Sequence, residues 1–192
     1  MRRYTKSLVL TIILAIVIHF ALVASLPNIV MGIALKRIEK TALKVAQARG
    51  IDVKNLKIEN RILHAPPRTA DTREVVAPNP DLLFSVVLYD VRERPLFISA
   101  PVPDSYWSIS FYASNTVNFF IKGSKNTRSN PVRLLLVSKH SDYSTPHNIE
   151  MVKAASDKGI ILFRYLIKNK IHLKDLDKLR KKTVVKSVEL SG

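Results

Sequence analysis

The sequence predicts an α+β protein: one N-terminal transmembrane helix and an amphipathic helix, followed by a mostly antiparallel β-sheet or sandwich with a short C-terminal helix. Three observations support this prediction. Residues Leu8 to Leu26 contain no Asp, Glu, Lys or Arg, residues 28–50 repeat apolar side chains at helical spacing, and short apolar runs alternate with turn signals after residue 80. The predicted segments are an anchor over 1–27, an amphipathic helix over 28–50 and a globular domain over 51–192.

The apolar run is long enough to cross a bilayer. At roughly 1.5 Å per residue, a helix of its 19 residues is close to the ~30 Å hydrocarbon core. Thirteen of them are Leu, Ile, Val or Phe, which favours insertion by roughly 4 to 8 kcal/mol. We interpret His19, near the middle, as a neutral side chain of a single-pass anchor. A cleaved signal peptide stays open as an alternative, because Val23-Ala24-Ser25 is a tolerable cleavage pattern.

Basic residues flank the apolar run on both sides. Arg2, Arg3 and Lys6 precede it, and Lys36, Arg37, Lys40 and Lys44 follow it. The two groups are nearly equal, but the first is closer to the span and lies on a short tail, so we expect the tail in the cytoplasm. The predicted location is therefore the cytoplasmic (inner) membrane, with a single pass and a periplasmic globular domain.

The net charge of +16 points to an anionic partner. Nucleic acid is not expected, since the cations are spread along the chain and no zinc-finger, helix-turn-helix or RNA-recognition pattern is present. Near a bilayer, each Lys or Arg gains about 1 kcal/mol from anionic lipids, which makes the lipid bilayer the expected partner. The absence of cysteine excludes disulfides, thiolate metal sites and cysteine nucleophiles.

The segment 28–50 predicts a second helix after Pro27, ended by Gly50. Its apolar side chains recur at steps of four, three, four and three residues and share one narrow face: Met31, Leu35, Ile38, Ala42 and Val45. Three interpretations stay open. The face packs on the chain's own domain, pairs with a helix of a partner protein, or lies in the head-group plane.

From residue 82 the pattern is typical of strands. Leu82 to Tyr89 is apolar on both faces and needs cover on both, which indicates a sandwich or a sheet backed by helices. Further strands are expected over Leu96 to Ala100, Tyr106 to Tyr112, Val117 to Ile121, Val132 to Val137 and Ile160 to Ile167. Leu173, Leu176 and Leu179 predict the short C-terminal helix, with a basic end at Arg180 to Lys182.

The strand over Tyr106 to Tyr112 has two different faces. Trp107, Ile109 and Phe111 alternate with Tyr106, Ser108, Ser110 and Tyr112. Because successive side chains of a strand point to opposite sides, the first set is expected in the core. The second set then meets water or a ligand.

Several segments together resemble a known bacterial family. They are Val75 to Ser85, Pro95 to Pro101, Tyr106 to Phe111, the positions Thr116, Asn118 and Phe119, and more faintly Gly159 and Phe163 to Ile167, about half of the chain. This pattern is similar to the domain of unknown function 1254. Longer members are exported and continue into a second, mostly β domain, so the resemblance implies a short, membrane-anchored version that acts with a partner protein. The family's biochemical role is not established.

The chain departs from the family pattern at three positions. Ala113 stands where the family often has an acidic residue, and Leu82 and Phe84 stand where it often has Thr and Tyr. The departures remove polar groups from which an active site would be assembled. They favour a non-enzymatic role.

Five residues are the candidate ligand-binding set: Asn79, Asp81, Tyr106, Trp107 and Asn118. Turn formation is the more usual explanation of the first two, and cross-strand packing with loop hydrogen bonds explains the others equally well. We predict no catalytic residue, metal site or cofactor, since the histidines are scattered and no serine lies in a nucleophile-elbow context. The expected function is a non-enzymatic interaction or structural protein of the cell envelope. The alternative is an exported enzyme or small-ligand-binding domain that uses Asn79, Asp81 and Tyr106.

Overall fold

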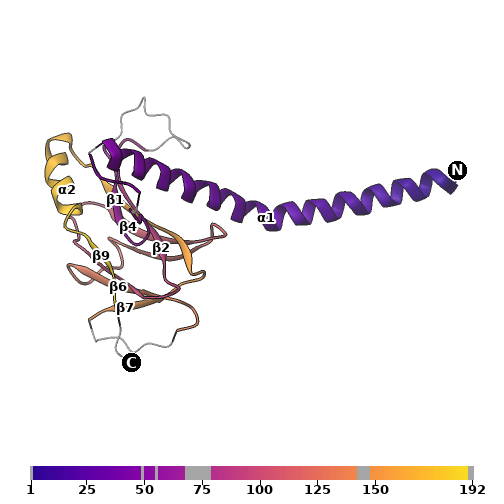
Figure 1. Cartoon of the computed structure of the whole chain (residues 1–192). Helices are drawn as coiled ribbons and strands as arrows, with labels where there is room; N and C mark the ends of the chain where they lie inside the picture. The colour runs from indigo at the N-terminus through magenta and orange to yellow at the C-terminus, as the bar shows by residue number, and fades with distance from the viewer. Residues whose placement is uncertain (1, 49, 55, 68–78, 142–147, 190–192) are drawn as a thin grey trace.

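The computed structural model of the chain describes residues 2–48, 50–54, 56–67, 79–141 and 148–189. The segment 75–78, which contributes to the family resemblance, lies outside the described residues. Figure 1 shows one long helix, α1, whose N-terminal half projects away from the rest of the chain and whose C-terminal half lies along it. The remaining elements form two sheets and a short helix.

The helix α1 runs without interruption over Arg2–Ala48 and contains Pro27. The expectation of two helices separated at this proline is therefore wrong. Proline removes one backbone hydrogen bond and bends a helix, but a single lost bond need not end a helix whose other bonds continue on both sides. Figure 1 shows the corresponding bend near the middle of α1. The expected stop is confirmed, because Gly50 adopts a positive φ of 74° and its N–H donates to the carbonyl of Gln47 at 3.0 Å.

The larger sheet has five antiparallel strands in the order β1-β2-β8-β4-β5. They are β1 (Ile62–His64), β2 (Leu82–Asp90), β8 (Lys158–Leu166), β4 (Trp107–Ala113) and β5 (Asn118–Gly123). The central strand β8 pairs with β2 on one side and β4 on the other. Strands β2, β4, β5 and β8 confirm the predicted strands to within two residues at each end, whereas β1 is additional.

The smaller sheet has the order β7-β6-β3-β9. Its strands are β7 (Glu150–Lys153), β6 (Val132–Val137), β3 (Leu96–Ala100) and β9 (Val184–Ser187). Only the β6 and β7 pair among these described strands is parallel. The predicted α+β class with mostly antiparallel strands is thus confirmed, and the sheets form a sandwich.

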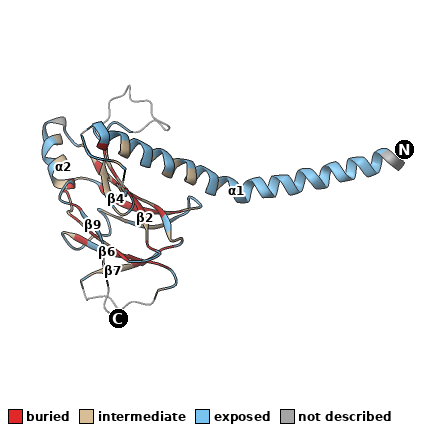
Figure 2. Cartoon of the chain, viewed as in Figure 1, coloured by how far each residue is buried: buried red, intermediate tan, exposed pale blue. Residues whose placement is uncertain are grey.

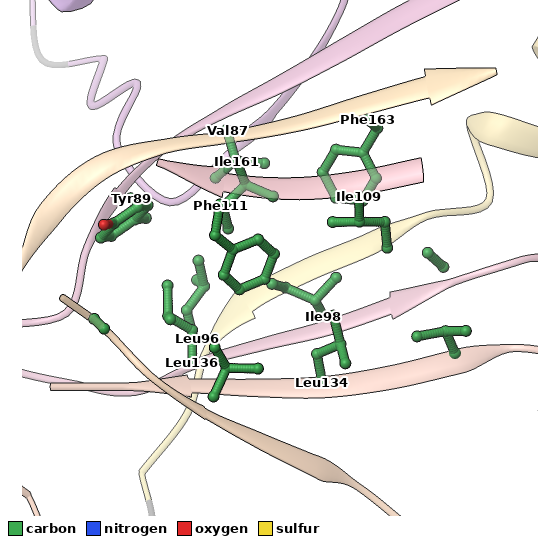
Figure 3. Close-up of a cluster of buried hydrophobic side chains, with 14 of the residues drawn as sticks. Val87, Tyr89, Leu96, Ile98, Ile109, Phe111, Leu134, Leu136, Ile161 and Phe163 are labelled. Carbon is green, nitrogen blue, oxygen red and sulfur yellow. The ribbon is translucent and has the colours of Figure 1, made fainter. Parts of the chain in front are cut away.

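The core lies between the two sheets. Figure 3 shows side chains of both sheets meeting there, among them Ile109, Phe111 and Phe163 from the larger sheet and Ile98 and Leu134 from the smaller one. All five are fully buried. Burying a side chain of this size contributes about 1.5–3 kcal/mol, so the alternating residues of β4 and β8 stabilise the sandwich.

The outer face of the larger sheet is covered by the C-terminal half of α1. Met31 and Ala46 are 6% and 9% exposed, and Leu35, Ile38 and Ala42 between them are half-buried. Helix α1 contacts β8, the central strand. Four of the five residues of the predicted apolar face therefore point to the sheet, while Val45 is 45% exposed. Pairing with a partner protein through this face would require the packing to open, and it stays a prediction.

The predicted C-terminal helix is confirmed as α2 (Leu173–Arg180), which follows a short 3₁₀ turn, η1 (Lys170–His172). Leu173 and Leu176 pack against the core. Helix α2 thus covers one margin of the sandwich before the chain returns to β9.

Candidate functional site

Asn79 and Asp81 form a turn at the start of β2. The backbone N–H of Asp81 donates to Asn79 Oδ1 at 2.9 Å, and the N–H of Leu82 donates to the carbonyl of Asn79 at 3.2 Å. Both side chains are exposed. The turn that was one interpretation of these residues is therefore present, and it holds Asp81 at the sheet margin.

The structure brings Asp81 and Tyr106 to the same end of the larger sheet. The carbonyl of Asp81 accepts from the N–H of Ile167 at 2.8 Å, and the carbonyl of Tyr106 accepts from the N–H of Leu166 at 2.8 Å. The two residues thus flank the end of β8. Tyr106 is 52% exposed, so its ring is accessible. Ligand binding at this end stays a prediction.

Trp107 and Asn118 do not join this end. Trp107 is 1% exposed and belongs to the core, which corrects its inclusion among ligand-contacting residues, since its side chain points between the sheets. Asn118 pairs with Tyr112, opposite Ile160 at the start of β8, whereas Tyr106 lies near Leu166. Six residues of strand separate the two positions by about 20 Å. One ligand of ordinary size cannot contact both.

A row of polar side chains lies on the outer face of β4 and β8. Arg164 donates from Nη2 to Tyr112 Oη at 3.1 Å and from Nη1 to Ser110 Oγ at 3.5 Å. Ser108, directly opposite Arg164, is 4% exposed, and its Oγ has no hydrogen-bond partner among the described residues. None of the ion pairs among the described residues includes Arg164. The sequence predicted that this face meets water or a ligand, but it did not indicate that α1 covers much of it.

The second polar cluster surrounds Arg180, which is 2% exposed. Its guanidinium donates to Asp177 Oδ1 at 2.7 Å and to the backbone carbonyls of Phe84 and Ala65 at 2.6 and 2.8 Å. Three elements are joined by these bonds, because Asp177 belongs to α2, Phe84 to β2, and Ala65 follows β1. Of the predicted basic helix end, Arg180 is thus buried, whereas Lys181 and Lys182 are exposed.

Ser85 and His64 lie beside this arginine. His64 Nδ1 and Ser85 Oγ are 2.8 Å apart, and Arg180 Nη1 donates to Ser85 Oγ at 3.4 Å. A serine next to a histidine is the pair of a nucleophile and its base. Ser85, however, is fully buried, so a substrate has no access to its hydroxyl. The geometry indicates a structural role for the pair in holding β1 on β2.

The pH dependence of folding is expected to report on His64. Burial and the nearby charge of Arg180 lower the pKa of His64 from 6.5 to about 4. The unfolded chain then binds more protons between these values, so this contribution to stability is complete above about pH 6.5 and is lost as the pH falls to about 4. We expect the urea midpoint to decrease over this interval, and the variant His64→Gln to give a flatter profile.

The pKa of Asp90 lies outside the pH interval in which His64 acts. The hydrogen bond from Arg92 is the main cause that lowers the pKa of Asp90 from 3.8 to about 2, so its contribution disappears only below about pH 4. If the urea midpoint of His64→Gln depends on pH between 6.5 and 4 as steeply as that of the unaltered chain, the pH dependence does not come from His64.

The N-terminal half of α1 carries a long run of exposed apolar side chains. Every Leu, Ile, Val and Phe side chain from Leu8 to Val30 is at least 50% exposed. Figure 2 shows this half as continuously exposed, in contrast to the sandwich. The helix is long and apolar enough to cross a membrane. Among the described residues, no group of three or more His, Asp or Glu side chains is placed to hold a metal ion.

The sandwich of this chain matches a known protein family. The family described as "Protein of unknown function (DUF1254)" matches residues 59–187. The chain belongs to this family. The DUF1254 match starts just before β1 and ends with β9, so it includes the clusters around Arg164 and Arg180 and leaves α1 outside. No curated protein matches the chain.

Two solved structures are similar to the DUF1254 sandwich. The VPA0106 protein from Vibrio parahaemolyticus has a TM-score of 0.52 and 16% identity, and the match covers 60% of this chain and 33% of that one. An uncharacterised protein from Burkholderia cenocepacia has a TM-score of 0.43 and 14% identity, covering 69% and 36%. The first likeness shows the fold alone. The chain corresponds to about a third of the length of either protein.

Proposed function

We propose that this DUF1254 protein is a single-pass protein of the cytoplasmic membrane that holds its sandwich in the periplasm as a non-enzymatic interaction or structural domain. One observation supports this most directly. No described residue packs against the apolar half of α1, and every Leu, Ile, Val and Phe side chain from Leu8 to Val30 is exposed. Soluble proteins rarely expose apolar patches beyond a few hundred Å², and a lipid core removes this surface from water.

The arrangement of polar groups supports a non-enzymatic role. The exposed candidates Asp81 and Tyr106 lie at one end of β8, and Asn118 lies near the other. The Ser85 and His64 pair is closed to substrate. Since catalysis needs reacting groups within hydrogen-bond reach of one substrate, neither set supplies a catalytic constellation.

The anchor is tested by placing charges in the middle of the span. We expect the unaltered chain to stay in the membrane pellet after an alkaline carbonate wash, and the double variant Leu14→Lys/Val17→Lys to be released. Each lysine at the centre costs roughly 2.5–3.5 kcal/mol of insertion free energy, so two offset most of the roughly 4 to 8 kcal/mol of the span. The matched control Leu14→Ile/Val17→Leu should stay in the pellet.

Two results would refute the anchor. One is release of the unaltered chain by carbonate, and the other is a mature protein whose sequence begins just after Ser25. The side of the membrane is tested separately by fusions at the C-terminus. A periplasmic domain should give an active alkaline phosphatase fusion and a dark green-fluorescent-protein fusion, and the reverse pattern would place the domain in the cytoplasm.

A further inference from the structure

We infer that the sandwich sits directly on the head groups of the bilayer and binds anionic lipid there through the cations of α1. This inference rests on the proposed anchor and adds the position and the lipid partner of the domain. It comes from the length of the uncharged part of α1, from the point where packing begins, and from the position of the cations along the same helix.

The uncharged part of α1 is longer than a hydrocarbon core requires. From Ser7 to Leu35 there is no Asp, Glu, Lys or Arg. A helix of these 29 residues is roughly 43 Å long at about 1.5 Å per residue, which equals the ~40–45 Å of a bilayer with both head-group layers. The charges of Lys6 and Lys36 would then lie at the two outer surfaces of the membrane.

Packing of the domain begins inside this uncharged stretch. Met31 is 6% exposed and faces the sheet. Around the same turns of the helix, Ile29, Val30 and Ile33 are 53%, 51% and 48% exposed. One side of α1 is thus already covered by the sandwich where the other side still presents apolar side chains. Lipid covers those side chains only if the sandwich reaches the head-group layer at the level of Ile33.

The connection between span and domain is one continuous helix. Helix α1 continues through the span into the packed segment, and no linker separates the two. The bend at Pro27 precedes Met31 and therefore lies on the membrane side of the packing. The distance along α1 between the span and the sandwich is therefore fixed unless the packing of α1 on β8 opens.

The basic residues of α1 begin just after the exposed apolar side chain of Ile33. Lys36, Arg37, Lys40 and Lys44 are all exposed, and at 100° per residue they lie on the side of α1 opposite Met31. Glu39 is the single acidic residue of α1. Lys36 and Arg37 come within one turn of Ile33, inside the ~8 Å over which a surface charge acts at physiological salt. Each such cation favours anionic lipid by about 1 kcal/mol.

The position is tested by depth-dependent quenching in vesicles. Because the chain has no cysteine, the single variants Val17→Cys, Ile33→Cys, Lys36→Cys and Lys174→Cys carry one fluorophore each. We expect Val17 to be quenched by deep acyl-chain nitroxides, and Ile33 and Lys36 by head-group nitroxides. Lys174 is exposed on helix α2, on the side of the sandwich away from the N-terminal half of α1 (Figure 1), and its label should be quenched only by aqueous iodide.

The outcomes distinguish a failure of this inference from a failure of the proposed anchor. If the Val17 label is quenched by lipid while Ile33 and Lys36 respond only to iodide, the anchor holds but the domain stands away from the surface, and the inference is wrong. If the Val17 label is not quenched by lipid, the anchor itself fails.

The lipid class is tested by electron spin resonance of spin-labelled phosphatidylglycerol and phosphatidylcholine. The unaltered chain should immobilise the anionic lipid several-fold more strongly, and the variant Lys36→Gln/Arg37→Gln should lose most of this preference. The control Lys174→Gln/Lys178→Gln on α2 should retain it. Equal immobilisation of both lipids by the unaltered chain would overturn the anionic-lipid partner.

Discussion

Replacing Arg180 by methionine is expected to destabilise the sandwich by about 3–5 kcal/mol, because two hydrogen bonds from the charged guanidinium to backbone carbonyls are lost and each contributes about 1.5–3 kcal/mol. Methionine fills much of the volume but donates no hydrogen bond. The carbonyl of Phe84 then keeps only the N–H of Ala65 as a donor, and the side-chain donor to the carbonyl of Ala65 is lost. Asp177 is less affected, because its carboxylate is 24% exposed and still pairs with Lys181.

The measurement is urea unfolding of the full chain in mild detergent. Trp107 is the one tryptophan of the sequence and is 1% exposed, so its fluorescence follows the core. The control is Lys178→Met, an exposed cation on the same helix, for which we expect a change within about 0.5 kcal/mol. A loss below about 1 kcal/mol in Arg180→Met would show that the buried guanidinium does not hold α2 to β1 and β2.

The second large effect is expected at Gly159. A Cβ built there lies 2.1 Å from the carbonyl oxygen of Tyr112 and 2.6 Å from Tyr89 Oη. Tyr89 Oη cannot easily move, because it is buried and lies 3.2 Å from the carbonyl oxygens of both Tyr112 and Ser156, which share its one O–H proton. Burial also raises the pKa of Tyr89 to about 12, so the hydroxyl keeps this proton. Overpacking costs about 1–3 kcal/mol and more when backbone must move, so we expect Gly159→Ala to lose about 3 kcal/mol.

The matched control is Gly32→Ala in α1. An added Cβ at Gly32 has nothing within 4 Å, and alanine is the better helix former by roughly 1 kcal/mol. The two variants therefore carry the same chemical change in opposite surroundings. Urea midpoints that fall equally in both, or that fall in neither, would contradict the close approach of Tyr112 to β8.

The long strands follow from local patterns in the sequence. Leu82 to Tyr89 is apolar on both faces: Leu83, Val87 and Tyr89 pack in the core between the two sheets, and Phe84 and Val86 on the other face are half-buried. Strands β1, β7 and β9 are not predictable in this way, since they have three or four residues with polar side chains among them. They form because a neighbouring strand offers unpaired backbone groups. The residues of these short strands therefore do not reveal them, because the partner strand lies elsewhere in the sequence.

The polar clusters are less predictable than the fold. Alternation along β4 correctly separates Trp107 from Ser108, but it does not say that a helix covers the serine side. Arg180 is one of 31 Lys and Arg residues, and its immediate neighbours Lys181 and Lys182 are also basic. Its burial depends on carbonyl groups about a hundred residues away at Ala65 and Phe84. No local window contains that information.

The order of strands has a consequence for how the protein is made. Leu82 pairs with Leu166, and Leu96 pairs with Ser187, so each sheet needs strands from the end of the chain. Such non-local pairing delays folding until the late segments have been synthesised. Helix α1 is therefore synthesised long before the sandwich can close. A product interrupted before Val184 leaves one edge of β3 unpaired, which makes it a substrate for proteolysis or aggregation.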